Sequence, residues 1–372
     1  MNISYIKRKL VRKLHLGALF YEIENMVTPD DVAKKYDSKE LEKYVNNVHP
    51  DMGESCLCTN SIEEPKYDLE IIVPVYNAER YLRECMESIL SQETSYTYHV
   101  TCVNDGSTDN SRIILKEYAD DSRVSIIDKE NGGASAARNT ALKQIYARYV
   151  TFVDADDRLH NGAIQSLMDV AIKEDVDIVR GGHLYFDVNR IQYVTSYKQE
   201  KCEPYKTVGI ACGIVYRATL WRKLCYPKGY WYEDTNCFVI ASVANTAYTI
   251  DSIVYDYRKN NVSMTHIGIG NVKSVDSYYV TKKVLADIKS LDKLDSQELY
   301  ECMLHQLLTN FLRITDIGDR KLDKAIFLLS CDMIEEYFPD KHSETMQGKE
   351  IEQTVKERDF KHFKLNCMYR WI

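Results

Sequence analysis

From Leu69 to Val153, short apolar runs alternate with stretches whose apolar residues recur at helical spacing. Runs of this length fit buried strands, and the stretches between them fit amphipathic helices. The predicted strands are 69–75, 99–104, 124–128 and 149–153, and the predicted helices are 79–91, 111–119 and 134–146. This alternation predicts an α/β fold whose mostly parallel sheet is flanked by helices on right-handed crossovers.

Regions of different character flank this predicted core. Residues 1–66 are charged, are predicted to be helical, and end in a polar stretch at 54–65 that we interpret as a connector. Strand signals stop at about residue 270, and apolar positions over 274–340 predict helices. We expect an N-terminal extension over 1–66, a core domain over 67–268 and a helical C-terminal region over 269–372.

Composition places the chain among ordinary globular proteins. Hydrophobic residues make up 45% of the 372 positions and charged residues 28%, and the net charge of −8 argues against a general nucleic-acid binder. The eleven cysteines are scattered singly, so we expect reduced thiols in a reducing compartment. No apolar run is long enough to span a bilayer and no signal peptide is recognisable, so a cytoplasmic location is expected.

The first twenty residues combine apolar positions at helical spacing with a cluster of positive charge. The basic residues are Lys7, Arg8, Lys9, Arg12 and Lys13. Two interpretations remain open. The segment lies on an anionic membrane surface, at the inner face of the cell membrane, or it packs as an amphipathic helix on the protein's own core.

Polar sequences follow each of the four predicted strands. They are Pro74-Val75-Tyr76-Asn77, Asn104-Asp105-Gly106-Ser107-Thr108-Asp109, the Asn131–Asn139 stretch with its two glycines, and Asp154-Ala155-Asp156-Asp157. In an open α/β sheet, ligands bind beyond the carboxyl ends of the strands. We therefore expect these four sequences to face one crevice.

The fourth of these sequences carries the most specific chemistry. Residues two apart in an extended segment point to the same side, so Asp154 and Asp156 present their carboxylates together. Two neighbouring carboxylates repel each other unless a positive group joins them, and a divalent cation that also binds a diphosphate is a suitable partner. Arg138, one turn into the helix after Gly132 and Gly133, is placed to meet a phosphate.

Two further groups of polar residues, near positions 233 and 258, each allow a structural and a functional interpretation. Glu233 and Asp234 either cap the following helix, which their spacing favours, or supply a general base, with Trp231 or a neighbouring tyrosine facing a sugar ring. Arg258 is placed to bind phosphate, and His266 is a metal ligand, a donor to the diphosphate or a surface histidine.

Taken in order, these pieces resemble the family 2 glycosyltransferases with the GT-A fold, which has a Rossmann-like sheet. The resemblance spans about residues 69–266. By its overall character the chain resembles the bacterial transferases of capsule and exopolysaccharide assembly. Its landmarks are VPVYNAERYL (73–82), NDGSTDNS (104–111), ENGGASAARN (130–139), FVDADD (152–157), GYWYEDT (229–235) and YRKNNVSMT (257–265). One departure is Asn104, where many relatives carry a second aspartate.

The resemblance implies an inverting, metal-dependent enzyme that moves a sugar from a nucleotide diphosphate sugar, with a UDP-sugar favoured, to an acceptor hydroxyl. The acceptor would be a glycan that is free, lipid-linked or protein-linked. The cation would be Mn²⁺ or Mg²⁺. A non-catalytic sugar-nucleotide-binding partner of a glycan assembly complex is the alternative, and an oligomer is left open.

The resemblance also implies roles for individual residues around the donor. Pro74, Tyr76 and Glu79 would line the nucleobase pocket, with Asp105 against the base or ribose. Asn131 and Arg138 would border the donor.

The remaining implied roles concern the diphosphate and the transferred sugar. Asp154 would face the ribose or sugar, and Asp156 would ligate the cation, joined by Asp154 and His266 as further candidate ligands. Asp234 would be the catalytic base, and Glu233 would orient it or the acceptor. Arg258, with Ser263 and Thr265, would close over the diphosphate.

Overall fold

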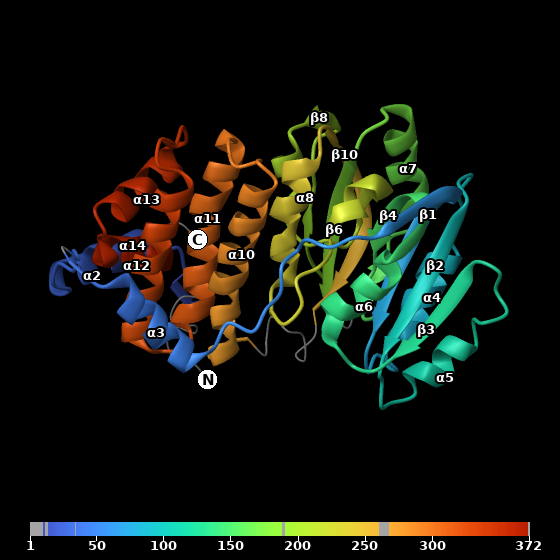
Figure 1. Ribbon diagram of the computed structural model, residues 1–372, viewed down its shortest axis with the longest axis horizontal. Coiled ribbons are helices and arrows are strands. Elements are labelled where there is room, and N and C mark those ends of the chain that lie inside the picture. Colours follow the sequence, from blue (N-terminus) through green and yellow to red (C-terminus); the bar gives the residue numbers. More distant parts are fainter. Residues whose placement is uncertain (1–9, 12–13, 34, 188–189, 260–267, 371–372) are drawn as a thin grey trace. The chain divides into compact units, whose positions relative to one another are not determined.

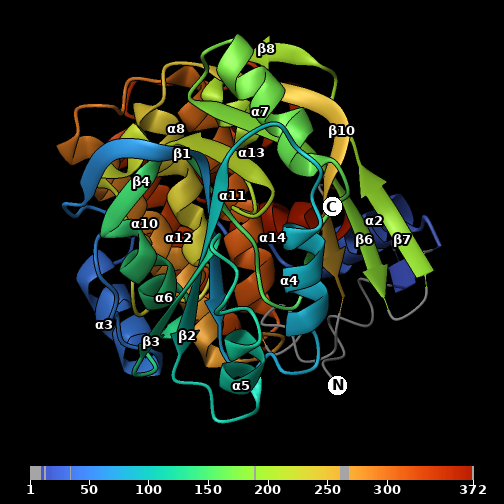
Figure 2. The same cartoon turned by 90° about the vertical axis from the view of Figure 1, so that its right-hand side faces the viewer.

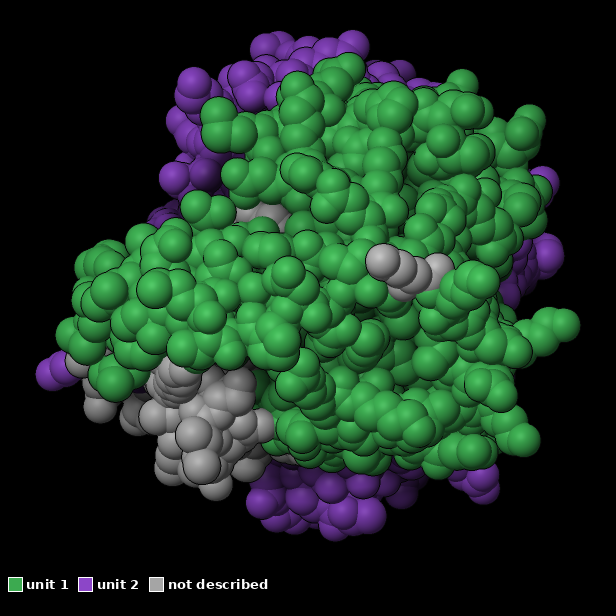
Figure 3. Space-filling view, turned by 90° about the vertical axis from the view of Figure 1, so that its left-hand side faces the viewer, with its two compact units in different colours: residues 1–53, 230–232, 261–372 green, residues 54–229, 233–260 purple. Residues whose placement is uncertain are grey.

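The computed structural model describes residues 10–11, 14–33, 35–187, 190–259 and 268–370 (Figure 1). The chain forms two compact units. The first comprises residues 1–53, 230–232 and 261–372, and the second comprises residues 54–229 and 233–260 (Figure 3). The three-part division at residues 66 and 268 stays a prediction.

The second unit is built on a ten-stranded sheet of order β3-β2-β1-β4-β9-β6-β10-β5, with β7 beside β6 and β8 beside β10. The strands are β1 (Ser61–Val75), β2 (Tyr98–Asp105), β3 (Val124–Lys129), β4 (Gln144–Phe152), β5 (Arg158–Leu159), β6 (Ile178–Asp187), β7 (Arg190–Thr195), β8 (Glu200–Cys202), β9 (Ile214–Arg217) and β10 (Ala247–Arg258). The four predicted strands are present as β1 to β4, and they are parallel to one another.

Strand direction decides which chain segments meet at the edge of this sheet. The short strand β9 is antiparallel to both β4 and β6, so β4 and β6 run in the same direction. Strand β10 is parallel to β6. The carboxyl ends of β1, β2, β4 and β10 therefore lie at one edge.

Helices cover both faces of the parallel part of the sheet. The helices of this unit are α4 (Leu82–Leu90), α5 (Ser111–Lys116), α6 (Gly133–Leu142), α7 (Ala163–Lys173) and α8 (Cys237–Val243). Right-handed crossovers from β1 through β2 to β3 place α4 and α5 on one face, and the return from β3 to β4 places α6 on the other (Figure 2). The strand order therefore reverses between β1 and β4, where an α/β sheet opens its ligand crevice.

The centre of the sheet explains why β1 reads as a continuous apolar run. Ile71, Ile72 and Val73 are each 0% exposed, as expected for a parallel strand that is covered on both faces.

The structure corrects two sequence predictions at the start of β1 and β4. The helix predicted over 134–146 ends at Leu142, and Gln144 already belongs to β4, opposite Ser61 of β1. The stretch 54–65, interpreted as a connector, therefore becomes strand from Ser61 onward. Its polar side chains are tolerated because this end of β1 is largely exposed, and Pro65 lies in a register shift where no regular ladder bond is lost.

The first unit is helical. Its helices are α2 (Gly17–Val27), α3 (Ser38–Val48), α10 (Asp276–Ser290), α11 (Gln297–Thr315), α12 (Arg320–Tyr337), α13 (Met346–Lys356) and α14 (Phe360–Tyr369). The helices predicted over 274–340 are confirmed as α10, α11 and α12.

The described part of the N-terminal segment packs on the protein itself. Val11 and Tyr21 lie in a buried cluster with Leu365, Met368 and Tyr369 of α14. Residues 1–9, 12 and 13, which hold the basic cluster, lie outside the described residues. Val11 is buried, whereas Leu10 and Leu14, two apolar positions at helical spacing in this segment, are 55% and 53% exposed. Both interpretations of residues 1–20 therefore stay predictions.

The cysteines and helices show two further general features. All eleven cysteines lie in the described ranges, and none of them forms a disulfide bond. Within the described ranges, none of the helices combines the length and the apolarity that a bilayer crossing requires.

Candidate functional site

An acidic turn, Asp154-Ala155-Asp156-Asp157, leaves the carboxyl end of β4 next to β1. Asp154 and Asp156 are partly exposed, whereas Ala155 and Asp157 are buried. The Asp157 N–H donates to the Asp154 carbonyl at 3.0 Å, so these residues form a hydrogen-bonded turn and not the extended segment expected from the sequence. The third carboxylate, Asp157, is turned into the protein, and burial together with the charges of Asp156 and Asp154 raises its pKa well above the usual range of an aspartate.

A buried arginine joins this turn to the predicted catalytic dipeptide. One terminal nitrogen of Arg138, on α6, lies 2.7 Å from Oδ1 of Asp154, and the other lies 2.8 Å from Oε1 of Glu233. Burial opposes the charge of Arg138, but the carboxylates of Asp154 and Glu233 outweigh this effect and hold its pKa well above that of a free arginine. Because this guanidinium points at protein carboxylates, its predicted contact with phosphate stays a prediction.

The predicted dipeptide lies in a 3₁₀ turn, Glu233–Asn236, directly before α8. The N-terminus of α8 has no side-chain cap, and Glu233 is 7% exposed with its carboxylate bound to Arg138. Glu233 therefore acts as an ion-pair partner and does not cap α8. Asp234, the next residue, is partly exposed.

Burial raises the pKa of the Cys212 thiol well above its usual range. The charges of Asp154, Asp234 and Asp157 raise it further, whereas the charge of Arg138 lowers it.

The loop with two glycines binds Asp105, which is 2% exposed at the end of β2. The Asp105 carboxylate accepts hydrogen bonds from Gly132 N–H at 3.0 Å and Gly133 N–H at 2.7 Å, at the N-terminus of α6. Lys129 Nζ lies 2.5 Å from the same carboxylate. Sequence analysis missed Lys129. The available signal was its place at the end of β3, where the parallel register sets it beside Asp105.

The other residues predicted to surround the nucleobase belong to loops that bind each other. Glu79 Oε2 accepts the backbone N–H of Asn110 at 2.9 Å, and Asn131 Nδ2 donates to the carbonyl of Asp105 at 3.0 Å. Pro74 lies near the end of β1, and Tyr76, in the loop that follows, is 53% exposed. Their predicted roles towards a base are not tested by these contacts.

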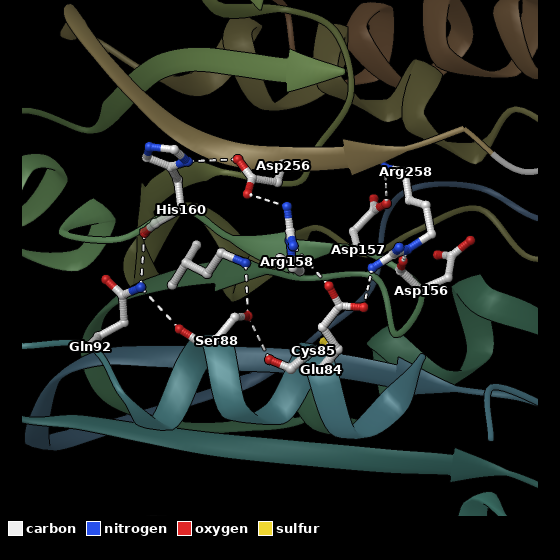
Figure 4. A network of polar contacts seen from close by, with 11 residues as sticks. Glu84, Cys85, Ser88, Gln92, Asp156, Asp157, Arg158, His160, Asp256 and Arg258 are labelled. Atoms are coloured by element: carbon white, nitrogen blue, oxygen red, sulfur yellow. Dashed lines mark hydrogen bonds and ion pairs between the residues drawn. The ribbon is translucent and has the colours of Figure 1, made fainter. Parts of the chain in front are cut away.

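Arg258, at the end of β10, is held by groups of the protein (Figure 4). Its Nε donates to the carbonyl oxygen of Asp156 at 2.7 Å, and a terminal nitrogen lies 2.6 Å from Oε2 of Glu84 on α4. Glu84 was not predicted from the sequence. The predicted partners of Arg258 at Ser263 and Thr265, and the candidate ligand His266, lie outside the described residues.

The aromatic cluster next to the dipeptide belongs to the first unit. The Tyr230 hydroxyl donates to Asp51 at 2.6 Å, and the Arg313 guanidinium lies 3.8 Å from the centroid of the Tyr232 ring. Trp231 is partly exposed, and its role as a sugar platform stays a prediction.

The donor atoms at the β4 turn fit a hard divalent cation. Among the described residues, no three His, Cys, Asp or Glu side chains converge on one point as a complete metal cage would require. Mg²⁺ and similar cations are commonly bound by one or two carboxylates together with water and substrate phosphates. Asp154 and Asp156 would supply two carboxylates of this kind, although Oδ1 of Asp154 is already bound to Arg138.

Comparison with known proteins gives a consistent picture. Residues 70–236 match the family model described as Glycosyl transferase family 2. Over 187 residues the chain is 35% identical to glycosyltransferase GlyA of Streptococcus pneumoniae. The matched region covers 45% of this chain and 27% of GlyA. Over 165 residues it is 30% identical to the Escherichia coli UDP-Glc:alpha-D-GlcNAc-diphosphoundecaprenol beta-1,3-glucosyltransferase WfgD, covering 43% of this chain and 64% of WfgD. The chain thus matches less than two thirds of the length of either relative.

A solved structure extends the similarity to the fold. Staphylococcus aureus TarS 1–349 in complex with UDP-GlcNAc superimposes with a TM-score of 0.62 at 19% identity, covering 80% of this chain and 89% of that one. The expected GT-A fold is thereby confirmed.

The ion pairs of Arg138 predict a large and local effect on stability. Replacing Arg138 by Met keeps an unbranched stem but leaves Asp154 and buried Glu233 without their cation, so we expect a loss of about 3–5 kcal/mol in the free energy of unfolding. Urea denaturation measures it. Arg112→Met is the matched control, because it breaks the exposed pair with Asp128 and should cost about 1 kcal/mol or less. Equal losses in the two variants would contradict the role of Arg138.

Proposed function

We propose that this chain, whose residues 70–236 match the model of the family 2 glycosyl transferases, is an inverting, metal-dependent enzyme that transfers a sugar from a nucleoside diphosphate to an acceptor hydroxyl. One observation carries the proposal. A single buried guanidinium, Arg138, holds the Asp154 carboxylate of the β4 turn and the Glu233 carboxylate beside Asp234. These two ion pairs support the proposal, because they would hold a donor site at Asp154 and a base at Asp234 at a constant distance from each other.

The donor we propose is a UDP-sugar. The names of two similar proteins support this choice, since TarS was solved with UDP-GlcNAc and WfgD is named for UDP-Glc. The name of WfgD also supports a lipid-linked glycan as acceptor and a role in bacterial cell-surface polysaccharide synthesis.

In the proposed reaction, Asp234 accepts the proton of the acceptor hydroxyl while the hydroxyl oxygen attacks the anomeric carbon. The bond from that carbon to the diphosphate breaks, and the nucleoside diphosphate leaves with the electron pair. One displacement inverts the anomeric configuration. Arg138 binds Glu233 and so would hold the backbone of the dipeptide in place. This would keep the Asp234 carboxylate in position to accept the proton of the acceptor hydroxyl.

Asp156, with Asp154, would hold Mn²⁺ or Mg²⁺ at the end of β4. The bound cation would supply positive charge beside the diphosphate. The residues of the chain orient the donor, and Arg258 supports the backbone of Asp156 from the neighbouring strand.

We also propose a peripheral membrane contact through α2. The exposed face of α2 carries the apolar side chains Leu19 (55% exposed), Ile23 (48%), Met26 (81%) and Val27 (74%), together with exposed Glu22. The sequence just before it carries five basic residues between positions 7 and 13. An apolar helix face next to positive charge is typical of segments that lie on anionic lipid surfaces.

Removing the proposed base tests the chemical step. Asp234→Asn should lower the rate of UDP release from the donor by about 10²–10⁴-fold, because the variant cannot take a proton. The affinity for UDP and Mn²⁺, measured by calorimetric titration, should stay close to the wild type. Asp251→Asn, an exposed residue of β10, is the control and should keep full turnover. Wild-type turnover in Asp234→Asn would refute the base. Donor binding without turnover in the wild type would indicate a non-catalytic binding protein.

Removing the proposed metal ligand tests the donor site separately. Asp156→Ala should weaken Mn²⁺-dependent UDP binding by about tenfold or more, because one of two carboxylate ligands is lost. Calorimetric titration of UDP with Mn²⁺, and again with EDTA, measures the difference. An unchanged affinity in the presence of Mn²⁺ would remove Asp156 from the site.

The membrane contact is tested by flotation with vesicles. Wild-type protein should float with phosphatidylglycerol vesicles and much less with phosphatidylcholine vesicles, and added salt should reduce the effect. Leu19→Gln combined with Ile23→Gln should abolish flotation, whereas Ile191→Gln, at an exposed apolar position of β7, should not. Equal flotation of both variants would contradict a contact through α2.

A further inference from the structure

The acidic turn after β4 is tied to β10 by one buried tyrosine. The Tyr255 hydroxyl donates to Oδ2 of Asp157 at 2.8 Å and accepts the backbone N–H of Asp154 at 3.1 Å. Tyr255 and Asp157 are 0% and 3% exposed. The same two residues are joined by a backbone hydrogen bond from Asp157 N–H to the Asp154 carbonyl at 3.0 Å. The Tyr255 hydroxyl adds a second link between them and ties both to β10.

The strand β10 holds the turn at two further points. Oδ1 of Asp157 accepts the backbone N–H of Arg258 at 2.6 Å, and the Arg258 side chain donates to the carbonyl of Asp156 (Figure 4). Glu84 binds Arg258 and also Arg158, the residue that follows the turn. The Asp157 carboxylate and the Asp156 carbonyl of the turn are therefore already bound to groups of β10 before any ligand binds.

These contacts divide three acidic residues into two kinds. Asp154 and Asp156 have partly exposed side chains, while both carboxylate oxygens of Asp157 are used to hold backbone and hydroxyl groups. A turn that carries two repelling carboxylates spreads apart unless its backbone is restrained. Residues that orient metal ligands commonly change metal affinity by 10–100-fold when they are replaced.

We propose that Tyr255 and Asp157 are positioning residues that hold Asp154 and Asp156 at the spacing required for a divalent cation. The inference rests on the proposed function, because it assumes that these two aspartates bind the cation with a nucleoside diphosphate. Neither Tyr255 nor Asp157 contacts the cation itself. Their contribution is to keep the two ligands in place before binding.

The test compares two buried tyrosines. Tyr255→Phe should weaken Mn²⁺ binding in the presence of UDP by about 10–100-fold, because the Asp154 N–H and Asp157 lose their shared partner. Titration of Mn²⁺ followed by electron paramagnetic resonance measures binding directly, without turnover. Tyr149→Phe is the matched control, since the Tyr149 hydroxyl is also buried and makes two hydrogen bonds, to the carbonyls of Ala171 and Val176. It should lose stability but bind Mn²⁺ within about twofold of the wild type.

A second variant covers the case in which Tyr255→Phe does not fold. Asp157→Asn keeps the side-chain size and one acceptor for the Arg258 N–H, and it should also weaken Mn²⁺ binding. Where both variants fold, the double variant should bind about as weakly as the weaker single variant, because the two side chains act through one contact. Additive losses would contradict the shared role.

The outcomes separate this inference from the proposed function. Wild-type protein that binds no Mn²⁺ with UDP would overturn both. Wild-type protein that binds Mn²⁺, together with folded Tyr255→Phe and Asp157→Asn variants of wild-type affinity, would overturn the positioning role alone.

Discussion

Several carboxylates lie close together at the carboxyl edge of one sheet, and the positions of the surrounding residues depend on offsetting this negative charge. Neighbouring carboxylates in a poorly solvated place raise each other's free energy unless positive groups or hydrogen-bond donors offset them. Asp105 is met by Lys129 and by the N-terminus of α6. Asp154 is met by Arg138, which reaches the next acidic segment at Glu233. Each acid is thus balanced by a partner from another element, and the loops of the site are connected through these pairs.

Much of this arrangement could be predicted from the sequence because it is local. The apolar runs gave β1 to β4, and the polar sequences after them indicated the edge at which a ligand would bind. The partners of those polar residues could not be predicted in the same way. Glu84 on α4 is 174 positions from Arg258, and no local pattern reports such a pair. The extension of β1 to Ser61 was missed because an exposed strand end carries polar residues that resemble a connector.

The family match and the structure do not cover the same part of the site. The match ends at residue 236, whereas β10 begins at Ala247 and brings Tyr255 and Arg258 to the acidic turn. Its position follows from the order of the sheet, in which β9 and β6 separate it from β4. A region outside the matched residues therefore supports the backbone of the most characteristic motif inside them.

The path of the chain has a practical consequence. The polypeptide passes between the two units after residues 53, 229, 232 and 260, so neither unit is a continuous segment. Tyr230 and Tyr232 are held by Asp51 and Arg313 of the helical unit, and Glu233 follows immediately. A truncated gene product that lacks the C-terminal helices would leave Tyr232 without Arg313, one position before Glu233. Deletion of those helices would therefore remove a contact of the residue that directly precedes the proposed catalytic dipeptide.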